Sequence, residues 1–328
     1  MSHGRGRLRA IALEVALSFA AIVSIAAEGA NQAQRPICAI DMGSNSFKRI
    51  VGSFENGQYY QRSFEKLTLG VGDDVARHGR ISDPKLTDIE AALSAFKTAC
   101  EKEGAAPVVA IGTSAFRDAP NGTRAVEIAA KLGIPMEIAT ERRESELAYL
   151  VGSLGQDGYA VIDNGSRSIE LVAPEGGTLR YLVFNQGYRL AYETFFVAAD
   201  DPAAASLAFR ERLRQETLKV PFMKGKKKLV GVEFGEMVDV LFEPAALEGR
   251  VVTLQELQRK LHEITTSGAT GFQALKTRKD IDRALPRLAV AAFLTEQFGY
   301  ARIELTAREL GAGLIIEAGR KTRYDLHE

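Results

Sequence analysis

Residues 40–46 read I-D-M-G-S-N-S, and residues 162–168 repeat this stretch as I-D-N-G-S-R-S. In both copies an apolar run precedes the aspartate and a second apolar run follows the last serine, which predicts a strand, a tight turn and another strand. Asp163 follows Asp41 by 122 residues, a spacing far longer than the repeats of solenoid proteins. The repeat therefore predicts a duplicated domain, and we expect its two turns to face each other across a cleft.

Each turn combines residue types that suit the binding of an anion. Glycine lets a ligand approach the main chain closely, and serine adds a hydroxyl donor beside a row of backbone N–H groups. Asp41 and Asp163 together can hold a hard cation such as Mg²⁺, which binds few carboxylates and keeps several waters. A cation with two such turns makes a phosphate site. The alternative is that each Asp-x-Gly stretch is only a hairpin turn, where Asp and Gly are common.

The bulk composition describes an ordinary globular protein. A length of 328 residues allows about two domains, and a hydrophobic content of 46% supplies ample material for a core. The 42 acidic and 42 basic residues give a formal net charge of zero. Because nucleic-acid binding depends on an excess of basic residues, we expect no nucleic-acid partner.

The first 35 residues have the layout of a bacterial signal peptide or a short N-terminal anchor. Three arginines precede an apolar segment, residues 10–27, which is interrupted only by Glu14, and small residues follow it. We therefore expect a periplasmic or envelope-exported protein that contacts a membrane only through residues 10–27. The alternative is a cytoplasmic protein with a misassigned start codon or a disordered extension.

Two cysteines lie in different predicted elements. Cys38 falls in the apolar run before the first turn, and Cys100 lies near the end of a predicted helix. Each has the surroundings of a small buried thiol, and a bridge requires the two to be neighbours in space. We expect no disulfide between them.

The order of predicted elements is that of an α/β protein in two abutting halves. Three strands are expected from Ile37 to about Phe64, and a loop around Gly70 and Gly72. A helix capped by Ser82 follows, and residues 113–121 read as a polar loop after a buried strand. A helix capped by Thr140 places Glu144 near the positive end of the helix dipole, where a carboxylate tends to stay ionised.

Several stretches resemble the exopolyphosphatase and guanosine pentaphosphate phosphatase family, which belongs to the superfamily of actin, sugar kinases and heat-shock ATPases. The resemblance is carried by residues 39–48, 112–121, 141–150 and 161–170, with weaker echoes at 69–72, 187–190 and 307–313. It implies an α/β fold of duplicated actin-like (ribonuclease H-like) domains with an interdomain cleft. Domain I is expected to span residues 36–140 and to be completed by a C-terminal helix, 314–328; domain II is expected to span 141–313.

The resemblance also implies a hydrolase acting on acid anhydrides. Its expected reaction is the hydrolysis of terminal phosphoanhydride bonds of inorganic polyphosphate or a nucleotide polyphosphate, by attack of water assisted by Mg²⁺. The expected partner is polyphosphate or another phosphorylated small anion, and since family members are often dimers, a homodimer is a further expectation. The implied catalytic residues are Glu144 as the base, Asp163 and Arg117; the implied metal ligands are Asp41, Asp163 and Glu170; the implied phosphate-binding residues are Gly43, Ser44, Asn45, Ser46, Lys48, Gly165, Ser166, Arg167 and Ser168.

The chain departs from the family pattern at these sites, and some of the side chains can also have purely structural roles. Ser166 and Arg167 replace glycines of the second turn, and Glu233 and Phe234 stand where the family has further glycines. The alternative function is therefore a catalytically weakened member that acts as a polyanion-binding or regulatory protein. Taken without the resemblance, Arg117 with Asp118 can be a surface ion pair, Glu144 can be a solvated acid, and Glu170 can form a salt bridge across the sheet.

Overall fold

The computed structural model describes residues 35–324, apart from residues 198, 219, 243–248 and 267–277, and it leaves the side chains of 278–283 and 321–324 undescribed. The segment 1–34, on which the prediction of a signal peptide or anchor depends, lies outside the described residues. Within the described ranges, none of the helices combines the length and the apolar character that crossing a membrane requires. The chain divides into two compact units, one that runs to Thr140 and resumes at Gly311, and one of Glu141–Leu310.

The first unit is built on a five-stranded mixed sheet with the order β3-β2-β1-β4-β5. The first three strands form antiparallel hairpins, whereas β1, β4 and β5 are parallel. The elements are β1 (Ile37–Met42), β2 (Ser46–Glu55), β3 (Gln58–Thr68), α2 (Val71–His78), α3 (Asp83–Lys102), β4 (Val108–Gly112), α4 (Ser114–Asp118), α5 (Thr123–Lys131), β5 (Met136–Ile138) and α13 (Gly311–Tyr324).

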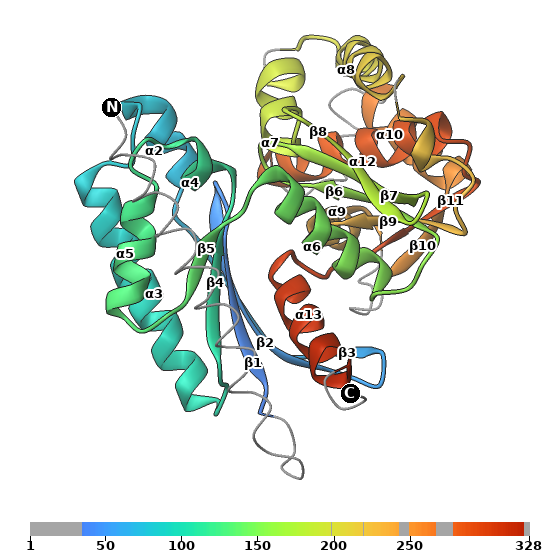
Figure 1. The fold of residues 1–328 in the computed structure, drawn as a ribbon. Helices are drawn as coiled ribbons and strands as arrows, with labels where there is room; N and C mark the ends of the chain where they lie inside the picture. Colours follow the sequence, from blue (N-terminus) through green and yellow to red (C-terminus); the bar gives the residue numbers. More distant parts are fainter. Residues whose placement is uncertain (1–34, 198, 219, 243–248, 267–277, 325–328) are drawn as a thin grey trace, which may run out of the picture. The chain divides into compact units, whose positions relative to one another are not determined.

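Helices cover both faces of this sheet (Figure 1). On one face α3 and α5 contribute Leu93, Phe96 and Ala129 to a core with Ile40 and Met42 of β1. On the other face lies α13, whose contacts with β1 and β2 depend on glycine. A Cβ on Gly319 would lie 2.4 Å from the carbonyl oxygen of Phe54, so only glycine allows this close packing.

The second unit is built on a six-stranded mixed sheet with the order β10-β11-β9-β6-β7-β8. The larger hydrophobic core packs against one face of this sheet and includes residues of α8, α9, α10 and α12. The elements are α6 (Glu141–Ser153), β6 (Tyr159–Asn164), β7 (Ile169–Glu175), β8 (Thr178–Phe184), α7 (Tyr188–Ala191), a π-helical turn (Tyr192–Phe196), α8 (Pro202–Thr217), a 3₁₀ turn (Pro221–Met223), β9 (Lys228–Val232), α9 (Gly235–Leu241), β10 (Arg250–Thr253), α10 (Leu254–Thr266), α12 (Arg278–Gln297) and β11 (Arg302–Leu305).

The two sheets repeat one topology, which confirms the prediction of a duplicated α/β fold. In each, three antiparallel strands are followed by two parallel ones, so that β3-β2-β1-β4-β5 corresponds to β8-β7-β6-β9-β11. The second sheet adds β10 at its edge, antiparallel to β11. The two repeated sequence stretches are the β1–β2 and β6–β7 connections, at equivalent places in the two sheets.

Two predicted loops contain helices. Residues 71–78 form α2 and residues 114–118 form α4, whereas glycine and polar residues in these segments predict loops. Gly72 lies inside α2 although glycine is a poor helix former. The glycine allows a close contact, since a Cβ at this position would lie 2.9 Å from the Cβ of Ser44. The helix predicted after Ser82 is confirmed as α3, and the Ser82 hydroxyl accepts a hydrogen bond from the Lys85 N–H.

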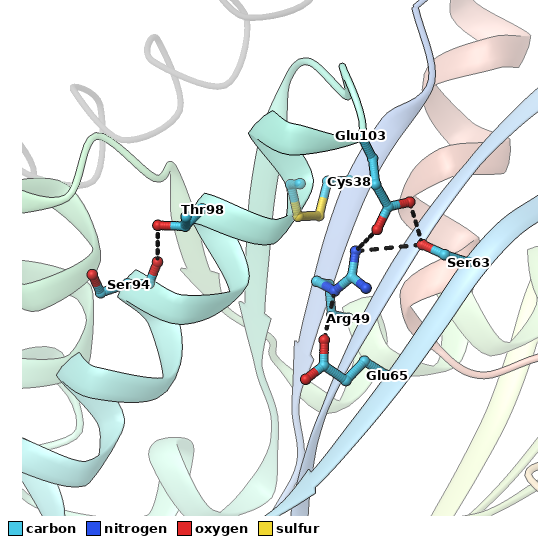
Figure 2. Close-up of a disulfide and its surroundings, with 8 residues drawn as sticks. Cys38, Arg49, Ser63, Glu65, Ser94, Thr98 and Glu103 are labelled. Carbon is cyan, nitrogen blue, oxygen red and sulfur yellow. Dashed lines mark hydrogen bonds and ion pairs between the residues drawn. A yellow bond between two sulfur atoms is a disulfide. The ribbon is translucent and has the colours of Figure 1, made fainter.

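The prediction of two unpaired cysteines is wrong, because Cys38 and Cys100 form a disulfide (Figure 2). Their Cα atoms lie 6.0 Å apart although they are separated by 62 residues in sequence. The bond joins the start of β1 to the last turn of α3, and both cysteines are fully buried. The sequence gives no sign of it, because it is the packing of α3 on the sheet that brings the two residues together.

Candidate functional site

The first repeated turn, residues 43–45, is held by the start of α2. The N–H groups of Leu69 and Gly70 donate to the carbonyl oxygen of Asn45 at 3.0 and 2.9 Å, and the N–H of Gly72 donates to that of Ser44 at 2.7 Å. The Ser44 hydroxyl also lies 2.9 Å from the hydroxyl of Ser114 on α4. These contacts use the carbonyl oxygens of the turn, the groups that would repel an anion.

The second turn, residues 165–167, is held in the same way by the start of α7. The N–H of Tyr188 donates to the Gly165 carbonyl at 3.0 Å, and the N–H groups of Gly187, Arg189 and Leu190 donate to the carbonyls of Arg167 and Ser166. A Cβ on Gly187 would lie 2.5 Å from the Arg167 backbone, so this contact requires glycine. The duplication therefore extends beyond the sequence motif to the way in which the fold holds each turn.

The glycines of the two turns do not serve an unusual backbone angle, and Gly43 is in a tighter contact than Gly165, whose Cβ would lie an ordinary 3.4 Å from the Ser168 carbonyl oxygen. Neither Gly43 nor Gly165 has a positive φ, and a Cβ on Gly43 would lie 3.1 Å from the carbonyl oxygen of Ser46. The described non-glycine residues with positive φ do not include Ser166 or Arg167. The second turn therefore accommodates both substituted residues without left-handed backbone strain.

In the first unit, Asp41 and Lys48 are direct cross-strand partners on β1 and β2. The Lys48 Nζ lies 3.4 Å from Asp41 Oδ2, and both side chains are less than a tenth exposed. The N-terminus of α13 lies against this pair, because a Cβ on Gly311 would be 3.4 Å from the Cβ of Asp41. Asp41 is therefore buried beside a lysine, just before the first turn.

Arg117 follows β4 on the short helix α4. Its Nη1 donates to the Ala139 carbonyl at 3.0 Å, and its Nε lies 3.9 Å from Asp118 Oδ1. The ion pair with Asp118, which is the alternative to a role in phosphate binding, is thus present with a long separation. The side chain is about a quarter exposed, with a relative accessibility of 23%, so the guanidinium remains partly open to solvent.

In the second unit, Asp163 and Glu170 are direct cross-strand partners on β6 and β7. Partners in an antiparallel pair project from the same face of the sheet, with Cβ atoms about 5 Å apart. Both side chains are buried, with relative accessibilities of 3% and 1%. Two carboxylates of like charge thus occupy neighbouring buried positions just before the second turn.

Glu144 belongs to α6. This helix covers the face of the sheet from which Asp163 and Glu170 project. Gly152 of α6 packs on Val161, since a Cβ there would lie 2.6 Å from the Val161 side chain, and Val161 shares a face with Asp163 because it precedes it by two residues. The short connection 154–158 makes α6 and β6 run in opposite directions. The N-terminal end of α6 therefore points toward the carboxyl end of β6.

This packing brings the three acids to one end of the second unit. Glu144 lies two turns, or about 12 Å, before Gly152 along α6, and Asp163 lies about 7 Å beyond Val161 along β6. Glu144 is buried, with a relative accessibility of 7%. The helix is anchored at its other end, where the buried Arg308 donates from Nε to the Val151 carbonyl at 3.0 Å.

A tyrosine further along α6 also fixes the helix. The Tyr149 hydroxyl donates to the Gln156 carbonyl at 3.1 Å, and burial raises the pKa of this phenol above its ordinary value. Tyr149 is therefore a neutral structural group that ties α6 to the connection before β6.

The predicted site residues form two groups, one in each compact unit. The first unit holds Asp41, Lys48, Arg117 and the turn Gly43–Ser46; the second holds Glu144, Asp163, Glu170 and the turn Gly165–Ser168. The residues that hold the turns, Gly72 and Gly187, were not predicted to have a role. The signal for them is that a second glycine-containing stretch follows the third strand of each half.

The model of the Ppx/GppA phosphatase family matches residues 50–307, a range that contains Arg117, Glu144 and the whole second turn. A search of curated proteins found no match.

Solved structures of the same family share the fold. The crystal structure of the Aquifex aeolicus Ppx/GppA family member aligns with a TM-score of 0.74 and 20% identity, over 90% of this chain and 99% of that one. An exopolyphosphatase from Cytophaga hutchinsonii aligns with a TM-score of 0.69 and 19% identity, over 86% of this chain and 96% of that one. The family match covers well over half of the sequence, and the chain therefore belongs to the Ppx/GppA phosphatase family.

Proposed function

We propose that this protein hydrolyses the terminal phosphoanhydride bond of inorganic polyphosphate or a nucleotide polyphosphate. The observation that carries the proposal is the placement of Glu144, Asp163 and Glu170 at one end of the second unit, beside a turn whose carbonyl oxygens are bonded by α7. Membership of a phosphatase family gives the reaction class. The substrate and the mechanism are our inference from the residues.

A divalent cation fits the acidic residues of the second unit. Asp163 and Glu170 are buried neighbours on one sheet face, where two ionised carboxylates repel each other unless a positive charge lies close by. Carboxylate oxygens are the ligands that Mg²⁺ prefers. We propose that these two residues hold Mg²⁺, and Asp41 remains a ligand predicted from the sequence. When bound, the cation would neutralise charge on the transferring phosphoryl group.

The chain's own side chains supply the remaining steps. Glu144 accepts a proton from the attacking water as the new oxygen–phosphorus bond forms and the bridging oxygen–phosphorus bond breaks. The leaving phosphate or shortened chain departs with the electrons of the broken bond. Backbone N–H and hydroxyl groups of the two turns bind phosphate oxygens, and Lys48 and Arg117 offset their negative charge.

We also propose that the protein works outside the cytoplasm, as the sequence of the first 35 residues suggests. The disulfide between Cys38 and Cys100 supports this proposal, because disulfides persist in oxidising compartments and are rare in the cytosol. In such a compartment cytosolic nucleotides are out of reach. Inorganic polyphosphate is then the better candidate substrate.

The test is phosphate release from medium-chain polyphosphate in the presence of Mg²⁺. Glu144→Gln should lower kcat by about 100-fold or more, because it removes the base without changing the shape of the side chain. The matched control is Glu141→Gln, an exposed acid one turn earlier on the same helix, which should stay within twofold of wild type. Wild-type protein that binds polyphosphate and releases no phosphate would contradict the proposal and favour the polyanion-binding alternative.

A further inference from the structure

Glu233 has a backbone conformation that its residue type disfavours. It lies between β9 and α9 with φ at +64°, in the left-handed region. The Cβ of an L-residue disfavours this region, whereas glycine adopts it freely. Folding alone would therefore favour glycine at this position, and the presence of Glu points to a role for the side chain.

The surrounding residues hold this conformation firmly. The buried Arg287 donates from Nε to the Glu233 carbonyl at 3.1 Å, and its Nη1 lies 3.3 Å from Glu236 Oε2. The same guanidinium lies 3.4 Å from the ring centre of Tyr188, whose N–H bonds the Gly165 carbonyl of the second turn. One packed group of residues thus fixes both Glu233 and the second turn.

The carboxylate of Glu233 lies against the second turn. Its Oε2 is 3.8 Å from the position that a Cβ on Gly165 would occupy, an ordinary van der Waals distance. The sheet register explains this placement, because Val232 pairs with Asp163 and Glu233 comes one residue later. The proposed phosphate-binding turn therefore has a carboxylate next to its glycine.

We propose that Glu233 is a specificity-determining residue that limits how much negative charge the second turn accepts. This inference rests on the proposed function. A carboxylate beside a bound phosphate group repels its oxygens, and this repulsion is stronger in a partly buried site than in water. The penalty grows with each further phosphate group that lies within reach. Glu233 thus favours a short phosphoanhydride over a long polyphosphate chain, by repulsion of the disfavoured substrate.

The test compares kcat/KM for diphosphate and for medium-chain polyphosphate in three proteins. Glu233→Gln keeps the size of the side chain and removes its charge, and we expect the ratio of polyphosphate to diphosphate kcat/KM to rise about tenfold, through KM. Glu233→Gly removes both the charge and the backbone strain and should raise the ratio similarly. The matched control, Asp239→Asn, removes an exposed acid on the adjoining helix α9 and should leave the ratio unchanged.

Two results would overturn the inference. One is an unchanged ratio in both Glu233 variants. The other is a loss of kcat on both substrates, which would make Glu233 part of the catalytic machinery. If neither wild type nor any variant releases phosphate, the proposed function is contradicted on its own. The affinities for diphosphate and polyphosphate, measured by calorimetry, then test the inference about Glu233. A tenfold gain in relative polyphosphate affinity in Glu233→Gln supports the inference, and equal affinities contradict it.

Discussion

At the scale of single residues, a charge network around the buried Arg49 stabilises the first unit. Arg49 of β2 contacts Glu103 through Nη1 and Glu65 through Nε, and the Ser63 hydroxyl donates to Glu103 Oε2 at 2.6 Å (Figure 2). The hydrogen bond from Ser63, followed by the hydrogen bond and charge of Arg49, holds the pKa of Glu103 below its ordinary value of 4.5. The folded state therefore favours the ionised carboxylate.

This lowered pKa predicts how stability depends on pH. The stabilisation by Glu103 is fully present above its ordinary pKa of 4.5 and is lost as the pH falls through the lower pKa of the folded state. At pH 7, Glu103→Gln should reduce the free energy of unfolding by about 1 kcal/mol, and the difference from wild type should shrink between about pH 5 and pH 3. Denaturant titrations at several pH values measure it.

The control for this prediction is Glu90→Gln, which changes an exposed acid on the same helix, α3. It should show no such pH-dependent difference. A gap between Glu103→Gln and wild type that is equally large at pH 3 and pH 7 would rule out the stabilising role of the ionised carboxylate.

Part of the residue-level arrangement is predictable from the sequence and part is not. A tight antiparallel hairpin pairs residues that are equally far from its turn, so the pairing of Asp163 with Glu170 follows from the motif itself. The left-handed backbone of Glu233 does not follow from its own residue type, and the signal for it is that Glu233 stands where the family has glycine. Its conformation comes from contacts with Arg287, which is distant in sequence.

At the scale of elements, the disulfide fastens α3 to the central strand of the first sheet. Cys38 is the second residue of β1, the strand that carries Asp41, and Cys100 is followed three residues later by Glu103 of the charge network. The disulfide and the network thus act on the same end of α3. Together they join this helix to both β1 and β2.

Replacement of both cysteines by alanine should destabilise the protein by about 4 kcal/mol, since the bond closes a loop of 62 residues in the unfolded chain. The measurement is the free energy of unfolding of wild type and the double variant under oxidising conditions. The chain has two cysteines in all, so wild type unfolded without reductant should show no reactive thiol. Two reactive thiols in that sample would contradict the disulfide.

Local sequence signals predict elements well where they agree with packing. Ser82 followed by Pro84 predicts the start of α3, and Thr140 precedes α6, as expected. The helix α2 is not predicted, because Gly70 and Gly72 indicate a loop, whereas the fold uses Gly72 for its contact with Ser44. The short strands β10 and β11 are also missed, since four residues carry too little pattern to separate a strand from its helical surroundings.

At the scale of the whole molecule, the chain repeats one sheet topology and one way of holding a turn. In each unit an aspartate is the penultimate residue of the first strand, and a glycine-serine turn follows. N–H groups at the start of a later helix bind the carbonyl oxygens of that turn. The repeated motif predicts this duplication. The contacts of α2 and α7 with the turns could not be predicted, because they join segments that are twenty or more residues apart.

The central proposal, which comes from the repeated motif and the family, is that Asp41 and Asp163 both take part in one metal-dependent hydrolysis. The most direct test is kcat/KM for phosphate release from polyphosphate with Mg²⁺ in wild type, Asp41→Asn, Asp163→Asn and the double variant. Each single change should lower kcat/KM by about 100-fold. Because residues that act as a unit are not additive, the double variant should be little worse than the worse single one. Losses that multiply in the double variant, or a wild-type protein that releases no phosphate, would contradict the account.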